Sequence, residues 1–81
     1  MTFKNKNILI TGANGMIGRA LLNKMMKLEA NILAVDLFKP KDLDNKIKFI
    51  AGDLREFSFC KEIMSGMDIA FHVAGIKGSP Q

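Results

Sequence analysis

The sequence predicts an α/β fold with a partial, doubly wound parallel sheet of four strands, in the order 3-2-1-4, and two main helices. Two observations carry this prediction. Short, wholly apolar runs alternate with segments whose apolar residues recur at helical spacing. A glycine-rich turn joins the first apolar run directly to the first helical segment. No linker divides the 81 residues, so we expect one domain over residues 1–81.

The first predicted strand and helix flank the glycine-rich turn. Residues 8–10 are apolar without a break, as in a parallel strand covered on both faces. From residue 16 to residue 29 the period becomes helical. The apolar residues of this segment form one stripe: Ile17, Leu21, Met25 and Leu28. We therefore expect an amphipathic helix that lies with this stripe on the sheet.

The rest of the chain continues the alternation. Pro40 and many charged residues make the stretch after the second strand a connection too short for a good helix. Phe59, Ile63 and Met67 recur four residues apart and predict a second helix. The remaining predicted elements are a strand over 32–35, a connection over 37–46, a strand over 47–51, a helix over 54–67, a strand over 69–74 and an exit over 75–81.

Composition argues against several classes of protein. The net charge of +4 comes from basic residues that are spread along the chain, and Trp and Tyr are absent, so we do not expect nucleic-acid binding. Cys60 is the single cysteine and His72 the single histidine, so neither a disulfide nor a metal site is expected. No apolar run suits a secretory signal or a membrane span, and we expect a cytoplasmic protein.

Three glycines with the spacing Gly-x-x-Gly-x-x-Gly suit a turn that holds a pyrophosphate. Gly12 allows a sharp turn, Gly15 lets the backbone approach the phosphates, and Gly18 lets helix and strand pack closely. The free N–H groups of Met16 and Ile17, at the positive end of the helix, would face the phosphate oxygens. The sequence therefore predicts a dinucleotide site at this turn.

Two structural interpretations of the turn stay open. Asn14-Gly15 is a favoured hairpin turn, although the residues that follow have a helical period rather than an alternating one. The glycines could also form a loop with a structural role alone. A Walker phosphate loop is excluded, because Gly-Lys-Ser/Thr does not follow the turn.

Asp36, at the end of the second strand, is the candidate for binding the adenosine ribose. Its carboxylate can accept hydrogen bonds from both ribose hydroxyls and would repel a 2′-phosphate, which favours NAD over NADP. Lys39 and Lys41 lie close in the sequence and could turn toward a phosphate, so this preference is not absolute. The structural alternative is a strand-end aspartate.

Asp53, after Gly52 at the end of the third strand, could accept the exocyclic amine of adenine, could cap the following helix, or could do both.

Cys60 is interpreted as a packing residue in the second helix. His72, inside an apolar strand, is interpreted as a hydrogen-bonded packing residue rather than an acid or base. The small residues Ala74 and Gly75 follow, where the second half of the cofactor would enter.

Together these motifs resemble the extended short-chain dehydrogenase/reductase family, the NAD-dependent epimerase/dehydratase group that acts on nucleotide sugars. Residues 8–18 resemble its opening strand and glycine turn, and Asp36 its ribose-binding acid. Gly52-Asp53-Leu54 resembles its adenine-contacting Asp-Leu pair, and His72-Val73-Ala74-Gly75 its His-x-Ala-Ala stretch. The resemblance implies a Rossmann-like NAD(P)-binding domain. The cofactor-binding residues that we assign are Gly12, Asn14, Gly15, Met16, Ile17, Gly18, Asp36, Asp53, Leu54, Val73, Ala74 and Gly75.

The chain departs from this family in its catalytic residues. Members carry a Ser or Thr and a Tyr-x-x-x-Lys, whereas this sequence has no tyrosine, so we assign no catalytic residue and expect no turnover by the chain alone. An apolar fourth strand with an unpaired edge also predicts that something covers it. We expect the amino-terminal part of a longer enzyme, without its catalytic and substrate-binding regions, or a short product that needs a partner.

Two functions follow from these observations. The first is the NAD-binding portion of an NAD-dependent nucleotide-sugar epimerase, dehydratase or reductase, whose full-length parent takes a nucleotide-sugar substrate. The alternative is a non-catalytic nucleotide-binding or assembly module that self-associates into a homo-oligomer through the exposed fourth strand.

Overall fold

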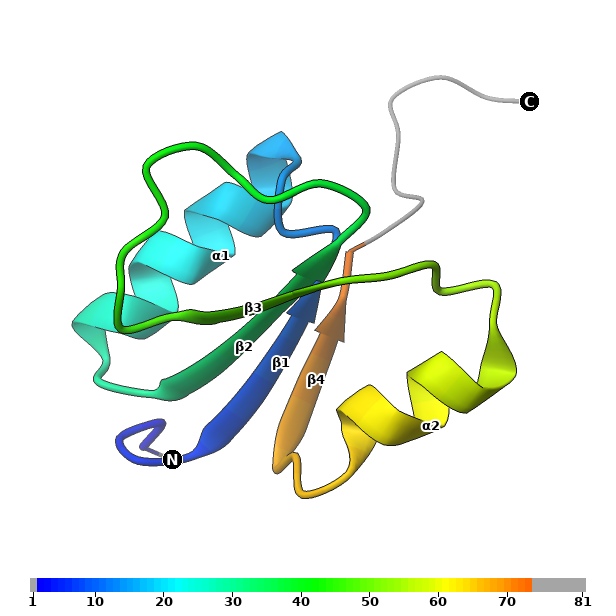
Figure 1. Ribbon diagram of the computed structural model, residues 1–81. Helices are drawn as coiled ribbons and strands as arrows, with labels where there is room; N and C mark the ends of the chain where they lie inside the picture. The colour runs from blue at the N-terminus through cyan, green and yellow to red at the C-terminus, as the bar shows by residue number, and fades with distance from the viewer. Residues whose placement is uncertain (1, 74–81) are drawn as a thin grey trace.

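The computed structural model describes residues 2–73, which form a four-stranded parallel sheet and two helices (Figure 1). The elements are β1 (Asn7–Thr11), α1 (Met16–Lys27), β2 (Asn31–Asp36), β3 (Lys48–Ala51), α2 (Phe57–Met64) and β4 (Ile69–His72). The strand order is β3-β2-β1-β4. The predicted fold class, element order and strand order are thus confirmed.

All four strands run parallel, so their carboxyl ends lie at the same edge of the sheet. Ile8 in β1 lies opposite Ile32 in β2 and Ile69 in β4, and all the pairings are parallel. The chain moves outward from β1 to β3, then returns across the sheet to form β4 on the other side of β1. Ligands of such folds bind beyond the carboxyl ends of the strands, where the strand order reverses. Here that reversal occurs at β1.

The two helices cover opposite faces of the sheet (Figure 1). Side chains alternate along a strand, so β1 supplies core residues to both faces. Buried residues on the α1 face include Ile8, Ile10, Leu22 and Met25. Those on the α2 face are Leu9, Leu33, Val35 and Ile63. The central strand is therefore sealed from solvent on both sides, as its unbroken apolar run predicts.

The buried face of α1 differs from the predicted stripe. The residues that α1 buries are Gly18, Leu22 and Met25. Ile17 is 50% exposed and Leu28 is 36% exposed, so the prediction was wrong for these two positions. The reason is the close approach at Gly18, where a Cβ would lie 2.1 Å from the Gly12 carbonyl oxygen. The helix can approach the turn so closely only with its glycine inward, which turns Ile17 outward.

The second helix is shorter than predicted. It covers Phe57–Met64 rather than 54–67, because the chain first makes a turn in which Glu56 N–H donates to the Asp53 carbonyl at 3.1 Å. The positive φ of Gly66, +77°, lies beyond its other end. As predicted, residues 37–46 contain neither helix nor strand. Neither α1 nor α2, the helices within residues 2–73, is long and apolar enough to cross a membrane.

Candidate functional site

The carboxyl ends of the four strands bring the predicted cofactor-binding segments to one edge of the sheet. The glycine turn follows β1, Asp36 ends β2, Asp53 lies just beyond β3, and His72 ends β4. Three main-chain hydrogen bonds connect these segments: Ala13 N–H to the Val35 carbonyl at 3.2 Å, Gly52 N–H to the Asp36 carbonyl at 3.1 Å, and Val73 N–H to the Thr11 carbonyl at 3.2 Å. Ala74 and Gly75 lie outside the described residues.

Backbone conformation and packing within the protein explain two of the three glycines in the turn, Gly12 and Gly18. Gly12 has φ +70°, a left-handed conformation that side chains rarely adopt. At Gly18 a Cβ would also lie 2.8 Å from the Ala13 Cα, and both neighbours are backbone atoms that cannot move aside easily. These two residues therefore set the shape of the turn and the approach of α1.

Gly15 differs from the other two, because the chain leaves room for a side chain there. Its φ of −79° and ψ of 172° are ordinary extended values. A Cβ at this position would meet the Gly12 carbonyl oxygen at 3.5 Å, which is normal van der Waals contact. Because α1 begins at the next residue, the hairpin interpretation of Asn14-Gly15 was wrong. What Gly15 contributes is an open surface at the start of α1.

The amino terminus of α1 has the features of an anion site. The first N–H groups of a helix lack partners within the helix, and here no side chain of the described residues caps them. Met16 is 88% exposed, and no acidic residue lies in the first turn. Phosphate oxygens can accept hydrogen bonds from such N–H groups, aided by the positive end of the helix dipole.

Asp36 lies beside the glycine turn, as expected from the predicted strand order, in which the first and second strands are neighbours. One carboxylate oxygen accepts a hydrogen bond from Asn14 N–H at 2.8 Å, and the other accepts from Leu37 N–H at 2.7 Å. The side chain is partly exposed, so its remaining lone pairs are open to a ligand. Its role in binding a ribose stays a prediction.

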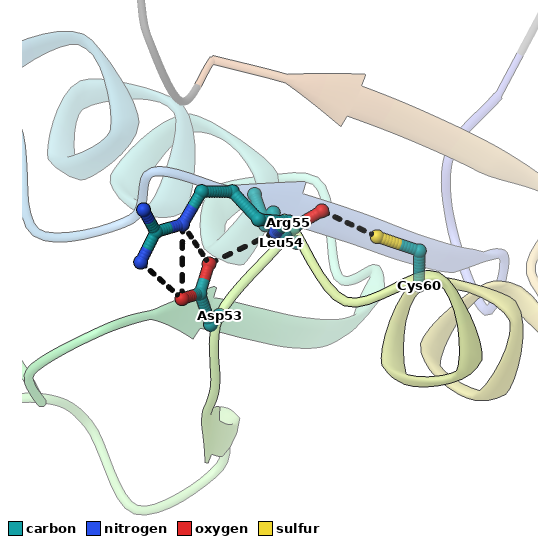
Figure 2. A network of polar contacts seen from close by, with 4 residues as sticks. All are labelled: Asp53, Leu54, Arg55 and Cys60. Atoms are coloured by element: carbon teal, nitrogen blue, oxygen red, sulfur yellow. Dashed lines mark hydrogen bonds and ion pairs between the residues drawn. The ribbon is translucent and has the colours of Figure 1, made fainter.

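Asp53 has a partner that the sequence analysis missed (Figure 2). Its carboxylate accepts from Arg55 N–H at 2.9 Å and from the guanidinium Nε and Nη2 at 3.1 and 2.7 Å. These hydrogen bonds and the positive charge of Arg55 lower the pKa of Asp53 to about 2. The Asp-x-Arg spacing after a strand was the available signal, because an aspartate often bonds the N–H two residues on.

The structure contradicts the capping alternative for Asp53. The residue at the N-cap of α2 is Glu56, and no side chain caps that helix within the described residues. Asp53 instead stabilises the turn that precedes α2, by bonding Arg55. The proposed contact with adenine stays a prediction, and an amine would have to share the carboxylate with this guanidinium.

Leu54 and Cys60 connect this turn to α2. The Cys60 thiol lies 3.0 Å from the Leu54 carbonyl oxygen and donates to it (Figure 2). The Leu54 side chain packs against the buried cluster on the α2 face. Both contacts are structural, which agrees with the interpretation of Cys60 as a packing residue.

His72 is tied to the end of β1. Its Nδ1 lies 2.8 Å from the Thr11 hydroxyl oxygen, and Thr11 is buried. The expected hydrogen-bonded role is thus present, although the ring is exposed rather than packed in the core. This pair and the bond from Val73 N–H hold β4 against β1 at the edge that carries the site.

We expect the Asp53–Arg55 pair to contribute to the acid sensitivity of the fold. The pKa of Asp53 is lowered in the folded chain, so its stabilisation is complete above pH 3.8 and is lost as the pH falls toward 2. The free energy of unfolding of the wild type should therefore decrease between pH 3.8 and pH 2. We expect this decrease to be smaller in Asp53→Asn, which has no carboxylate to protonate. Urea unfolding from pH 6 to pH 2 measures it, with exposed Glu62→Gln as the matched control. An unchanged acid limb in Asp53→Asn would contradict the assignment.

Comparison with known sequences finds one family along nearly the whole chain. The model of the NAD dependent epimerase/dehydratase family matches residues 8–81. UDP-glucose 4-epimerase from Rickettsia bellii (strain RML369-C) is 34% identical in an alignment that covers 96% of this chain and 26% of the relative. The protein from Rickettsia akari with the same name is 33% identical over the same shares. The chain thus spans about a quarter of the length of the curated relatives that it matches.

Solved structures match over the same region. A short chain dehydrogenase from Leptospira borgpetersenii with bound NAD+ superposes with a TM-score of 0.80 at 28% identity, over 93% of this chain and 33% of that one. MoeE5 in complex with UDP-glucose and NAD superposes with a TM-score of 0.74 at 28% identity, over 89% of this chain and 23% of that one. Both are dinucleotide-bound proteins in which this chain matches one segment.

Proposed function

Because this chain belongs to the NAD-dependent epimerase/dehydratase family, we propose that it binds NAD as the cofactor-binding portion of a nucleotide-sugar epimerase, dehydratase or reductase. The observation that carries the proposal is Gly15. The chain has room for a Cβ at this position, so packing within the protein does not explain the glycine. A pyrophosphate that approaches the main chain at the start of α1 does explain it.

The residues at the edge of the sheet fit the parts of a dinucleotide. The N–H groups of Met16 and Ile17 would hold the pyrophosphate, and Asp36 would accept the ribose hydroxyls. Asp53 and Leu54 lie just beyond β3, where the adenine would bind, and Val73 lies just beyond β4, where the nicotinamide half would bind. The bound cofactor would supply a hydride acceptor, and these residues would orient it.

Asp36 also supports NAD over NADP. Its carboxylate would lie close to a 2′-phosphate and repel it, and both carboxylate oxygens already have N–H partners that fix their position. The MoeE5 complex holds UDP-glucose together with NAD, which supports a nucleotide-sugar substrate for a full-length protein of this kind. No residue of this chain is assigned to the chemical step.

Titration with NADH tests the proposal. The wild-type chain should bind NADH and enhance its fluorescence, and NADPH should bind more weakly. Gly15→Ala places a methyl group where the pyrophosphate approaches, and we expect at least a roughly tenfold loss of NADH affinity, or about 1.4 kcal/mol. Gly15 is the N-cap of α1, and replacing it by alanine should change the free energy of unfolding of the ligand-free chain by about 1 kcal/mol at most.

The matched control is Asn23→Ala, an exposed position further along α1. This variant should bind NADH as the wild type does. A wild-type chain that shows no NADH binding at millimolar concentration would overturn the proposal. Equal affinity of wild type and Gly15→Ala would overturn the assignment of the pyrophosphate to Gly15.

The alternative, a nucleotide-binding or assembly module that self-associates, rests on the edge of β4. Within the described residues β4 pairs with β1 alone, so its other edge is free for a partner. The strand is only four residues long, however, and very short edge strands are one means by which proteins avoid edge-to-edge association. The NAD-binding proposal is therefore preferred.

A further inference from the structure

Asp36 makes hydrogen bonds to two other segments of the chain and to its own neighbour, Leu37. Its carboxylate accepts from Asn14 N–H in the glycine turn, at 2.8 Å, and from Leu37 N–H at 2.7 Å. Its main-chain carbonyl accepts from Gly52 N–H, in the loop after β3, at 3.1 Å. One residue at the end of β2 therefore joins the segments that would contact the pyrophosphate, the ribose and the adenine.

We propose that Asp36 is a positioning residue, whose carboxylate holds the glycine turn in its ligand-binding conformation before any ligand arrives. The identity of that ligand rests on the proposed function, whereas the positioning role concerns the chain without ligand. A ribose-binding acid alone would need no bond to Asn14. The contact spans 22 residues of sequence and crosses from β2 to the turn after β1.

The glycine turn has few other restraints at its centre. Gly15 N–H donates to the Gly12 carbonyl at 3.1 Å, and Ala13 N–H donates to the Val35 carbonyl at 3.2 Å. Between them, Asn14 N–H has the Asp36 carboxylate as its partner. Glycine loses more conformational freedom on ordering than any other residue. The centre of the turn has Gly12 and Gly15 on either side of Asn14, so a fixed acceptor for Asn14 N–H stabilises it. A carboxylate is a strong one, because the bond is charge-assisted.

The positioning role is compatible with ligand binding by the same carboxylate. Each carboxylate oxygen has two lone pairs, and the structure uses one on each for Asn14 and Leu37. The two remaining acceptor sites suit a pair of neighbouring hydroxyls. Asp36 would then couple the two halves of the site, because the group that accepts the ribose also fixes the turn that holds the phosphates.

Amide hydrogen exchange of the ligand-free protein, followed by NMR, tests the proposal. In Asp36→Ala we expect the Asn14 amide to exchange roughly tenfold faster or more, since bonds to charged acceptors contribute at least that factor. The Leu9 amide, in buried β1, should keep its protection and report that the chain remains folded. Asp44→Ala is the matched control, because the Asp44 carboxylate likewise accepts from a backbone N–H, that of Lys46 at 2.8 Å, and does not contact the glycine turn.

Asp36→Asn keeps the size of the side chain and provides a second test if the alanine variant does not fold. Its single carbonyl oxygen cannot replace both carboxylate oxygens, so the Asn14 or Leu37 amide should exchange faster than in the wild type. Unchanged exchange of the Asn14 amide in a folded Asp36→Ala variant would overturn the positioning role, and so would unchanged exchange of both amides in Asp36→Asn. A wild-type chain that fails to bind NADH would overturn the proposed function and leave this result standing.

Discussion

We expect Gly18→Ala to lower the free energy of unfolding by about 3 kcal/mol, at the upper end of the usual cost of overpacking. The added methyl group would lie 2.1 Å from the Gly12 carbonyl oxygen and 2.8 Å from the Gly12 carbonyl carbon. Both atoms belong to the backbone of a turn that Gly12 holds in a left-handed conformation. The helix must therefore move away from β1, and its contacts with the sheet weaken.

Thermal and urea unfolding of the ligand-free chain measure this effect. A loss of about 3 kcal/mol corresponds to a decrease in Tm of roughly 12–24 °C for a domain of this size. Gly15→Ala is the matched control, because it is the same chemical change three residues away, at a site with room for the methyl group. A Gly18→Ala variant as stable as Gly15→Ala would refute the close approach of α1 to the turn.

We expect Ile10→Ala to lower the free energy of unfolding by a comparable amount, about 2–5 kcal/mol, because it removes methyl and methylene groups from the core. Ile10 is completely buried in β1, between Ala34 of β2 and Phe71 of β4, on the face that α1 covers. Neighbours on three elements must collapse to fill the space, and a parallel sheet allows little such movement.

Urea midpoints of wild type and Ile10→Ala measure the loss, at an unchanged slope of the transition. Ile50→Ala is the control: it is the same substitution in β3, where the side chain is 41% exposed, and it should cost about 1 kcal/mol or less. Equal losses at the two positions would contradict the placement of the core around β1.

The sequence predicted the sheet well because each strand leaves a local signal. The unbroken apolar run of β1 indicates burial on both faces, and the structure seals that strand between α1 and α2. The inward face of α1 left no comparable signal. Ile17 looked like a core residue by spacing, whereas the inward position is taken by Gly18, which carries no side chain to reveal it. Apolar periodicity detects burial of side chains but not close approach of the backbone.

The parts of the site were predictable, and their contacts were not. Strand ends in a parallel sheet meet at one edge, so the glycine turn and Asp36 were expected to lie together. That the carboxylate of Asp36 would bond Asn14 N–H depends on the three-dimensional path of the turn. Likewise, Asp53 pairs with Arg55 instead of capping α2, because a turn intervenes before the helix begins at Phe57.

The pairing of β4 with β1 also has a consequence for how the chain folds. The Thr11–His72 contact closes a separation of 61 residues, whereas the Asn14–Asp36 contact closes one of 22. Closing a longer loop costs more chain entropy, and distant contacts slow the folding of small domains. We therefore expect β1, α1 and β2 to assemble early and β4 to dock late. The edge that would receive the cofactor is then completed only in the last step of folding.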